Sequence, residues 1–167
     1  MTFLSTFKHD IDEILRCPEC AASELRLDEK DVFRCLACEA EFPADLEKGF
    51  CVLLAGSSDT NEKTNIQKWW SDLYRQLYDG HEAGATAETM EENMVQVEDL
   101  FRKRRLLAVE EMPLHDVEGK RVLEIGPGGG AHSAVFKKHG ASVVAVDITA
   151  ERVAATARKL ALIGNGE

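Results

Sequence analysis

The chain has 167 residues, of which 44% are hydrophobic and 30% charged, and its net charge is −10. This composition is typical of a soluble protein with one or two domains, and no apolar run approaches the roughly 18 residues of a membrane span. Residues 1–60 carry 13 acidic against 6 basic side chains, which disfavours nucleic-acid binding there. Acidic residues also interrupt the amino terminus where a signal peptide needs an apolar core, so we expect a cytoplasmic protein.

Four cysteines form two close pairs near the amino terminus, CPEC and CLAC, with fourteen residues between the pairs. Two residues between thiolates let one turn present both sulfurs to the same ion, and two such turns complete a closed tetrahedral site. The sequence therefore predicts a structural Zn²⁺ held by Cys17, Cys20, Cys35 and Cys38. Between the pairs, apolar residues flank a DEKD turn, which predicts a β-hairpin over about 25–33.

This segment resembles the Trm112-like zinc ribbons, small proteins and domains known as companions and activators of methyltransferases. The residues that carry the resemblance are Leu15, Cys17, Pro18, Cys20, Leu25, Cys35, Cys38, Phe42, Pro43, Gly49, Val52, Leu53 and Leu54. Cys51 stands where the family has a proline, and the stretch from Pro43 to Gly49 is longer than usual. Cys51 has no second thiol or histidine at ligand spacing, so we expect it to be a small buried apolar residue.

Two helices are predicted in the middle of the chain. The first runs to Gly80 and has an aromatic face that includes Trp70, Tyr74 and Tyr78 at helical spacing. We expect this face to pack on a neighbouring core; the alternative is that Tyr74 or Tyr78 belongs to a lid over a ligand. The second helix is predicted from about Glu88 to Glu111. Its apolar stripe is Met94, Val97, Phe101, Ala108 and Met112, and Pro113 ends it.

A glycine-rich turn, GPGGG at 126–130, follows a predicted strand at 120–125. A helix at 132–139, a second strand at 142–147 and a helix at about 150–163 complete a β-α-β-α order. Two strands joined by one helix are expected to be parallel neighbours. In such sheets ligands bind beyond the carboxyl ends of the strands, where both the turn and Asp147 are placed.

The turn and Asp147 suit a ligand that contains adenosine. Gly126 and Gly128 permit a tight turn that a ligand can approach, and the Asp147 carboxylate can accept bonds from both hydroxyls of a ribose. The spacing G-x-G-x-x-A also matches a dinucleotide site, which remains an alternative. Glu124 favours S-adenosylmethionine, because its carboxylate suits an ammonium group and would repel a pyrophosphate.

The pattern E-x-G-x-G-x-G at 124–130 resembles motif I of the class I S-adenosylmethionine-dependent methyltransferases. The resemblance implies that Glu124, Gly126 and Gly128 hold the methionine portion, that Asp147 holds the ribose and that Ile148 lies beside the adenine. The implied cofactor-binding set is Glu124, Gly126, Pro127, Gly128, Gly130, Asp147 and Ile148. No catalytic residue and no methyl acceptor can be named.

The predicted fold is α/β in three parts: a Trm112-like zinc ribbon at 1–56, a helical connecting or lid segment at 57–114, and the first βαβα of a Rossmann-like sheet at 115–167. Two strands are fewer than the seven of the family, so we expect an amino-terminal fragment of a methyltransferase that is inactive alone. One alternative is a noncatalytic module that docks a partner, or another copy, through the ribbon and an unpaired strand edge. The other is a fragment of an NAD-dependent oxidoreductase.

Overall fold

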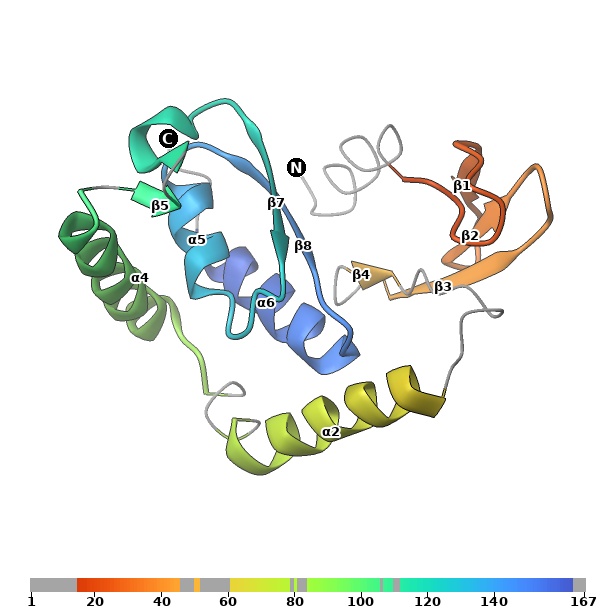
Figure 1. Cartoon of the computed structure of the whole chain (residues 1–167), viewed down its shortest axis with the longest axis horizontal. Coiled ribbons are helices and arrows are strands. Elements are labelled where there is room, and N and C mark those ends of the chain that lie inside the picture. Colours follow the sequence, from red (N-terminus) through yellow and green to blue (C-terminus); the bar gives the residue numbers. More distant parts are fainter. Residues whose placement is uncertain are drawn as a thin grey trace. The chain divides into compact units, whose positions relative to one another are not determined.

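The computed structural model describes residues 15–45, 50–51, 61–78, 80, 84–105, 107–109 and 112–163. It is a mixed α/β protein with a small antiparallel sheet followed by helices and a pair of parallel strands (Figure 1). The chain divides into two compact units, Met1–Lys68 and Trp69–Glu167. No helix among the described residues is long and apolar enough to cross a membrane.

The first unit contains four antiparallel strands in the order β1-β2-β3-β4. Their bounds are Leu25–Leu27, Val32–Cys35, Glu41–Asp45 and Phe50–Cys51. The predicted hairpin is confirmed, because Leu25 pairs with Cys35 across β1 and β2. Its turn is closed by Asp28, whose Oδ1 accepts hydrogen bonds from the backbone N–H groups of Lys30 at 2.8 Å and Val32 at 3.1 Å. An aspartate that bonds to the backbone two residues on is a typical initiator of such turns.

Among the described residues, the first unit has a small core. Its buried members are Cys17, Leu25, Phe33, Cys35 and Phe42. Two of these five are predicted metal ligands, so the apolar core and the cysteine cluster are continuous. Segments as short as residues 15–51 bury little apolar surface by themselves and usually need a metal or a disulfide for stability.

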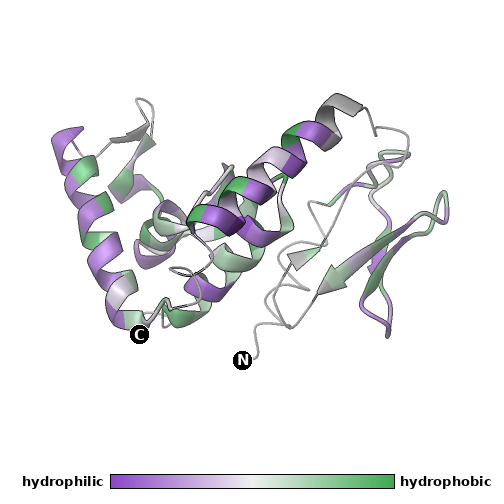
Figure 2. Cartoon of the chain, turned by 90° about the horizontal axis from the view of Figure 1, so that it is seen from below, coloured by the Kyte–Doolittle hydropathy of each residue, from purple (hydrophilic) through white to green (hydrophobic). Residues whose placement is uncertain are grey.

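Two long helices follow, α2 (Asn61–Leu77) and α4 (Ala87–Lys103). Helix α4 begins at a capping box, in which Thr86 and Thr89 exchange side-chain and backbone hydrogen bonds. Its buried side chains recur at intervals of three and four residues: Met90, Met94, Val97 and Phe101. Green apolar and purple polar residues alternate along this helix in Figure 2, as expected for a helix with one buried face.

The predicted continuation of this second helix to Glu111 is wrong. Helix α4 ends at Lys103, and Arg105 adopts a left-handed backbone with φ of 57°. The chain then forms two short antiparallel strands, β5 (Leu107–Val109) and β6 (Met112–Pro113), and a 3₁₀ turn, η2 (Leu114–Asp116). Ala108 and Met112 therefore leave the helical stripe, because a left-handed residue stops a right-handed helix whatever apolar spacing follows it.

The carboxyl-terminal elements follow the predicted β-α-β-α order: β7 (Arg121–Ile125), α5 (Ala131–Lys138), β8 (Ser142–Val146) and α6 (Ala150–Leu162). Strands β7 and β8 are parallel and in continuous register from Arg121↔Ser142 to Ile125↔Val146, as predicted. Both strands therefore end at the same edge, and the turn after β7 faces the residues that follow β8.

The two faces of this strand pair differ. On one face Val122 and Val143 join a core built mainly by α4 and α5. On the other face Leu123 and Ile125 are 61% and 81% exposed to solvent. Within the described residues β7 pairs with β8 alone. This strand pair thus has one covered face, and β7 has one unpaired edge.

Candidate functional site

The two cysteine pairs lie on matching backbone turns. In the first turn, the Cys17 N–H donates to the Ala22 carbonyl at 2.8 Å; in the second, the Cys35 N–H donates to the Ala40 carbonyl at 2.9 Å. The residue after each pair, Ala21 or Glu39, has a left-handed backbone with φ of 61° or 62°. The first cysteine of each pair is buried and the second is exposed, so the four thiols converge from two equivalent turns.

The four sulfurs have the spacing of a tetrahedral metal site. They all lie within 4.8 Å of one another, and the Cys17–Cys38 and Cys20–Cys35 Sγ distances are both 3.6 Å. A disulfide requires about 2.05 Å, whereas thiolates around one zinc at about 2.3 Å lie about 3.8 Å apart. The cluster can therefore hold a metal ion such as zinc. All four positions would be cysteine sulfurs, which is typical of a structural site.

The local electrostatics help one of these thiols to ionise. Backbone N–H groups of Cys38 and Ala37 donate to Cys35, and against the opposing effect of burial they lower its pKa to about 7. Metal binding requires the thiolate, so these N–H groups favour the ligating form. Cys51 differs: it is partly buried at the edge of the core, and this burial raises the pKa of its thiol to about 11.

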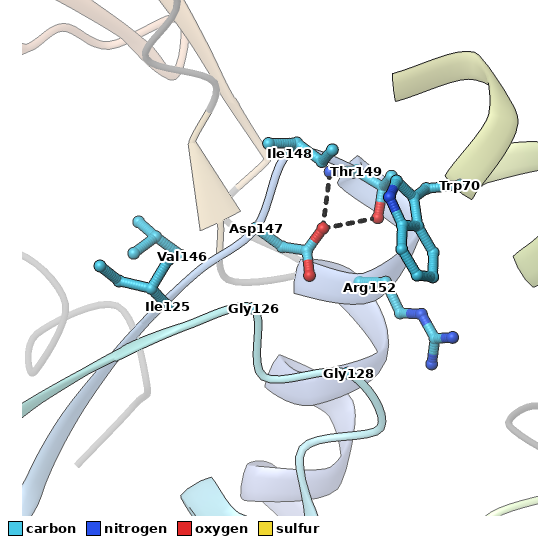
Figure 3. Close-up of a pocket in the computed structure, with 9 residues that line it drawn as sticks. All are labelled: Trp70, Ile125, Gly126, Gly128, Val146, Asp147, Ile148, Thr149 and Arg152. Atoms are coloured by element: carbon cyan, nitrogen blue, oxygen red, sulfur yellow. Dashed lines mark hydrogen bonds between the residues drawn. The ribbon is translucent and has the colours of Figure 1, made fainter. Parts of the chain in front are cut away.

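A cavity of about 540 Å³ lies at the carboxyl ends of β7 and β8 (Figure 3). It is lined by Trp70, Ile125, Gly126, Gly128, Val146, Asp147, Ile148, Thr149 and Arg152. Most of this lining is apolar, and Asp147 and Arg152 are its two charged residues. Four of the seven residues predicted to bind a cofactor line this space: Gly126, Gly128, Asp147 and Ile148.

The glycine turn leaves room for a ligand. Gly126 and Gly128 have φ of 70° and 57°, and a Cβ added to either would meet no heavy atom within 4 Å. Glycine is needed for the backbone conformation, and the space above both residues opens into the cavity. Lys159, a largely buried residue of α6, stabilises the turn. Its Nζ donates a hydrogen bond to the Gly129 carbonyl at 2.7 Å.

Asp147 is oriented by the residue that precedes α6. The backbone N–H and the hydroxyl of Thr149 both donate to Asp147 Oδ1, at 2.9 Å each. The second carboxylate oxygen points away from Thr149 (Figure 3). Thr149 occupies the N-cap position of α6, but its side chain makes no capping bond to the helix. Its hydroxyl bonds to Asp147 instead, so this residue positions the carboxylate.

The other three predicted cofactor residues do not line the cavity. The Glu124 carboxylate accepts a hydrogen bond from the hydroxyl of Ser133, a fully buried residue of α5. Pro127 is buried within the turn. Gly130 has φ of 75°, and a Cβ there would lie 3.0–3.1 Å from atoms of Thr156. Gly130 therefore allows the turn to approach α6 closely.

Trp70, Thr149 and Arg152 were not predicted to line a site. Trp70 belongs to the predicted aromatic face of α2, but helical spacing does not show what such a face contacts. Arg152 lies in the first turn of α6 with no local pattern to distinguish it from a solvated arginine. A contact between α2 and α6 brings Trp70 and Arg152 to the cavity.

That contact consists of polar and cation–π interactions. Ser71 Oγ donates to Glu151 Oε2 at 3.1 Å, and Arg75 Nε lies 3.6 Å from Glu151 Oε1. The Arg152 guanidinium lies 4.7 Å from the ring centroid of Tyr74 and 4.6 Å from that of Tyr78. Of the predicted aromatic face, Tyr74 is buried, whereas Trp70 and Tyr78 are 44% and 41% exposed, so this face is only partly covered.

Comparison with known proteins supplies no identification. No protein-family model matches the chain, and no curated protein or solved structure shows significant similarity to it.

Proposed function

We propose that the second unit binds S-adenosylmethionine in the cavity at the ends of β7 and β8 and that the protein acts in methyl transfer. The observation that carries this proposal is the position of Asp147 and the glycine turn on two neighbouring strand ends around one cavity. The resemblance of residues 124–130 to motif I of the class I methyltransferases supports the choice of this cofactor.

Each cavity residue has a role in this proposal. The outward oxygen of Asp147 would accept hydrogen bonds from ribose hydroxyls while Thr149 holds its other oxygen. Ile148 and Val146 offer apolar surface to the adenine, and the backbone at Gly126 and Gly128 can approach the methionine portion closely. The bound cofactor would supply an electrophilic methyl group for transfer to an acceptor. The chain's part is positioning and exclusion of water.

Glu124, Pro127 and Gly130 would act indirectly. Through its bond to Ser133, Glu124 ties the end of β7 to α5, while Pro127 and Gly130 shape the turn. The first unit, by its resemblance to Trm112-like ribbons, would be a structural zinc module carried on the same chain as the cofactor site. The cysteine geometry supports metal binding, and the resemblance supports the link to methyltransferases.

A dinucleotide is the second candidate ligand, and one observation favours it. Glu124 bonds to Ser133 and does not line the cavity, so its carboxylate is not placed to repel a pyrophosphate at Gly126 and Gly128.

Calorimetric titration of the full chain with S-adenosylhomocysteine and with NADH tests the two candidates. We expect the first ligand to bind and NADH to bind at least tenfold more weakly. Asp147→Asn should weaken S-adenosylhomocysteine binding about tenfold, equivalent to about 1.4 kcal/mol, because the amide loses the charge that strengthens bonds from ribose hydroxyls.

Asp116→Asn is the matched control for the charge change. Asp116 belongs to the same unit but pairs with His115 away from the cavity lining. Its substitution should leave the dissociation constant within twofold. Binding of NADH in preference to S-adenosylhomocysteine, or equal effects of the two substitutions, would contradict the proposal.

A further inference from the structure

Arg152 places a positive charge in the cavity that the cofactor contacts do not require. It is the one cationic residue among the nine that line the space. No ion pair links it to a carboxylate within the described part of the chain, and its contacts are with the rings of Tyr74 and Tyr78. A guanidinium held over a ring face can still donate hydrogen bonds from the N–H groups that lie in its own plane.

The surroundings of Arg152 oppose a purely structural role. The neighbouring acid, Glu151, is engaged by Ser71 and Arg75. Arg152 is also the third residue of α6, and a cation in the first turn of a helix lies at the disfavoured, positive end of the helix dipole. An anionic ligand would offset that unfavourable placement.

The charges in the cavity indicate which charge a second ligand would carry. Asp147 and Arg152 cancel, and S-adenosylmethionine carries a sulfonium, an ammonium and a carboxylate, so the loaded cavity would have a net charge of +1. An excess positive charge in a partly apolar space is unfavourable unless an anion lies near it. A second substrate with one negative charge would make the cavity neutral.

The residues that line the cavity indicate the chemical character of the rest of that substrate. Trp70 and Arg152 lie on the same side of the cavity, across from Ile125 and Val146 (Figure 3). We propose that the methyl acceptor is a small molecule with a carboxylate on an apolar or aromatic body. Its carboxylate binds the Arg152 guanidinium and its body contacts Trp70. This assignment rests on the proposed function.

Benzoate serves as the probe and benzamide as its neutral counterpart of the same shape. With S-adenosylhomocysteine at saturation, benzoate should bind the full chain at least tenfold more tightly than benzamide in calorimetric titration. Arg152→Gln should weaken benzoate binding at least tenfold. The same substitution should change benzamide and S-adenosylhomocysteine binding by less than twofold.

Arg152→Lys keeps a cation near the tyrosines and removes the planar fork, so benzoate binding should be intermediate. If Arg152→Gln does not fold, as judged by circular dichroism, Arg152→Lys alone tests whether Arg152 binds the carboxylate. The inference is overturned if benzoate does not bind the wild-type chain, or binds both variants as it binds the wild type. It is also overturned if S-adenosylhomocysteine binding falls as much as benzoate binding, because Arg152 would then serve the cofactor.

Failure of the proposed function gives a different result. If S-adenosylhomocysteine does not bind the wild-type chain, the methyl donor is wrong. Titration with benzoate alone then still tests the anion site, since loss of binding in Arg152→Gln supports it and unchanged binding excludes it.

Discussion

Gly130 is the residue at which the glycine turn meets helix α6. Its backbone is left-handed, and the site of its missing Cβ lies 3.0 Å from Thr156 Oγ1 and 3.1 Å from Thr156 Cα. A contact with backbone cannot be relieved by a side-chain rotation. This glycine therefore serves two needs at once, the conformation of the turn and the close approach of two segments.

Gly130→Ala should lower the free energy of unfolding by about 2–4 kcal/mol. Of this, about 1–2 kcal/mol is expected from an alanine at positive φ and about 1–2 kcal/mol from the contact with Thr156. Urea unfolding monitored by tryptophan fluorescence measures the change, because both tryptophans lie in the second unit.

Gly119→Ala separates these two causes. Gly119 has a similar φ of 68°, but a Cβ there would meet nothing within 4 Å. We expect this control to show the backbone cost alone. Equal losses in the two variants would show that Thr156 yields without cost and that close packing is not the reason for glycine at 130.

At the scale of elements, helix α4 is joined to the end of α5 by ion pairs as well as by its apolar face. Glu98 Oε1 lies 3.1 Å from Lys138 Nζ and 3.1 Å from His139 Nε2. Partial burial acts to raise the pKa of the Glu98 carboxyl, but the hydrogen bonds from Lys138 and His139 outweigh it and the net shift is downward. The folded state therefore favours the carboxylate.

This shift predicts a pH dependence of stability. A carboxyl whose pKa is lower in the folded state stabilises the protein above its unfolded pKa of about 4.3, and the contribution is lost as the pH falls through the folded pKa. Glu98→Gln should lower the free energy of unfolding by about 0.5–1 kcal/mol at pH 7 and by less at acid pH. Denaturant midpoints from pH 7 down to pH 3 provide the measurement.

Glu92→Gln is the control on the same helix, at an exposed position with no ion pair to a described residue. It should shift the midpoint by less than 0.5 kcal/mol at every pH. A loss in Glu98→Gln that is constant with pH would mean that packing, and not charge, links the two helices.

The boundaries of α4 show what an element's sequence can predict. The apolar spacing of Met94, Val97 and Phe101 predicted a helix and its buried face correctly. The same spacing continued through Ala108 and Met112 and predicted eight helical residues too many. Spacing records which side chains are buried, and a strand after a left-handed turn at Arg105 can bring Met112 against the core as well as a helix can.

At the scale of the whole molecule, the two units differ in what stabilises them. Among the described residues, the second has a core built mainly by α4 and α5, whereas the first shares its small core with the cysteine cluster. We expect the purified chain to contain one zinc per molecule. Removing it with a chelator at pH 7 should unfold the first unit alone, since metal binding there supplies about 10–16 kcal/mol.

Elemental analysis, circular dichroism and tryptophan fluorescence together test this. Chelation should remove β-sheet signal and leave the fluorescence-monitored unfolding of the second unit unchanged. Cys38→Ser should abolish stoichiometric zinc, and Cys51→Ala, the matched control, should retain it. A chelator-resistant first unit, or zinc retained by Cys38→Ser, would contradict the assignment.

The sequence by itself determined the features that follow from local spacing. Two CxxC pairs predicted the clustered thiols, and the order of apolar runs around GPGGG predicted the parallel strands and placed Asp147 beside the turn. Only the tertiary structure decided which residues line the cavity. It brought Trp70 and Arg152 to the cavity and turned Glu124 toward Ser133. Local patterns record which residues are buried or constrained, but the partner of each side chain depends on how distant segments pack.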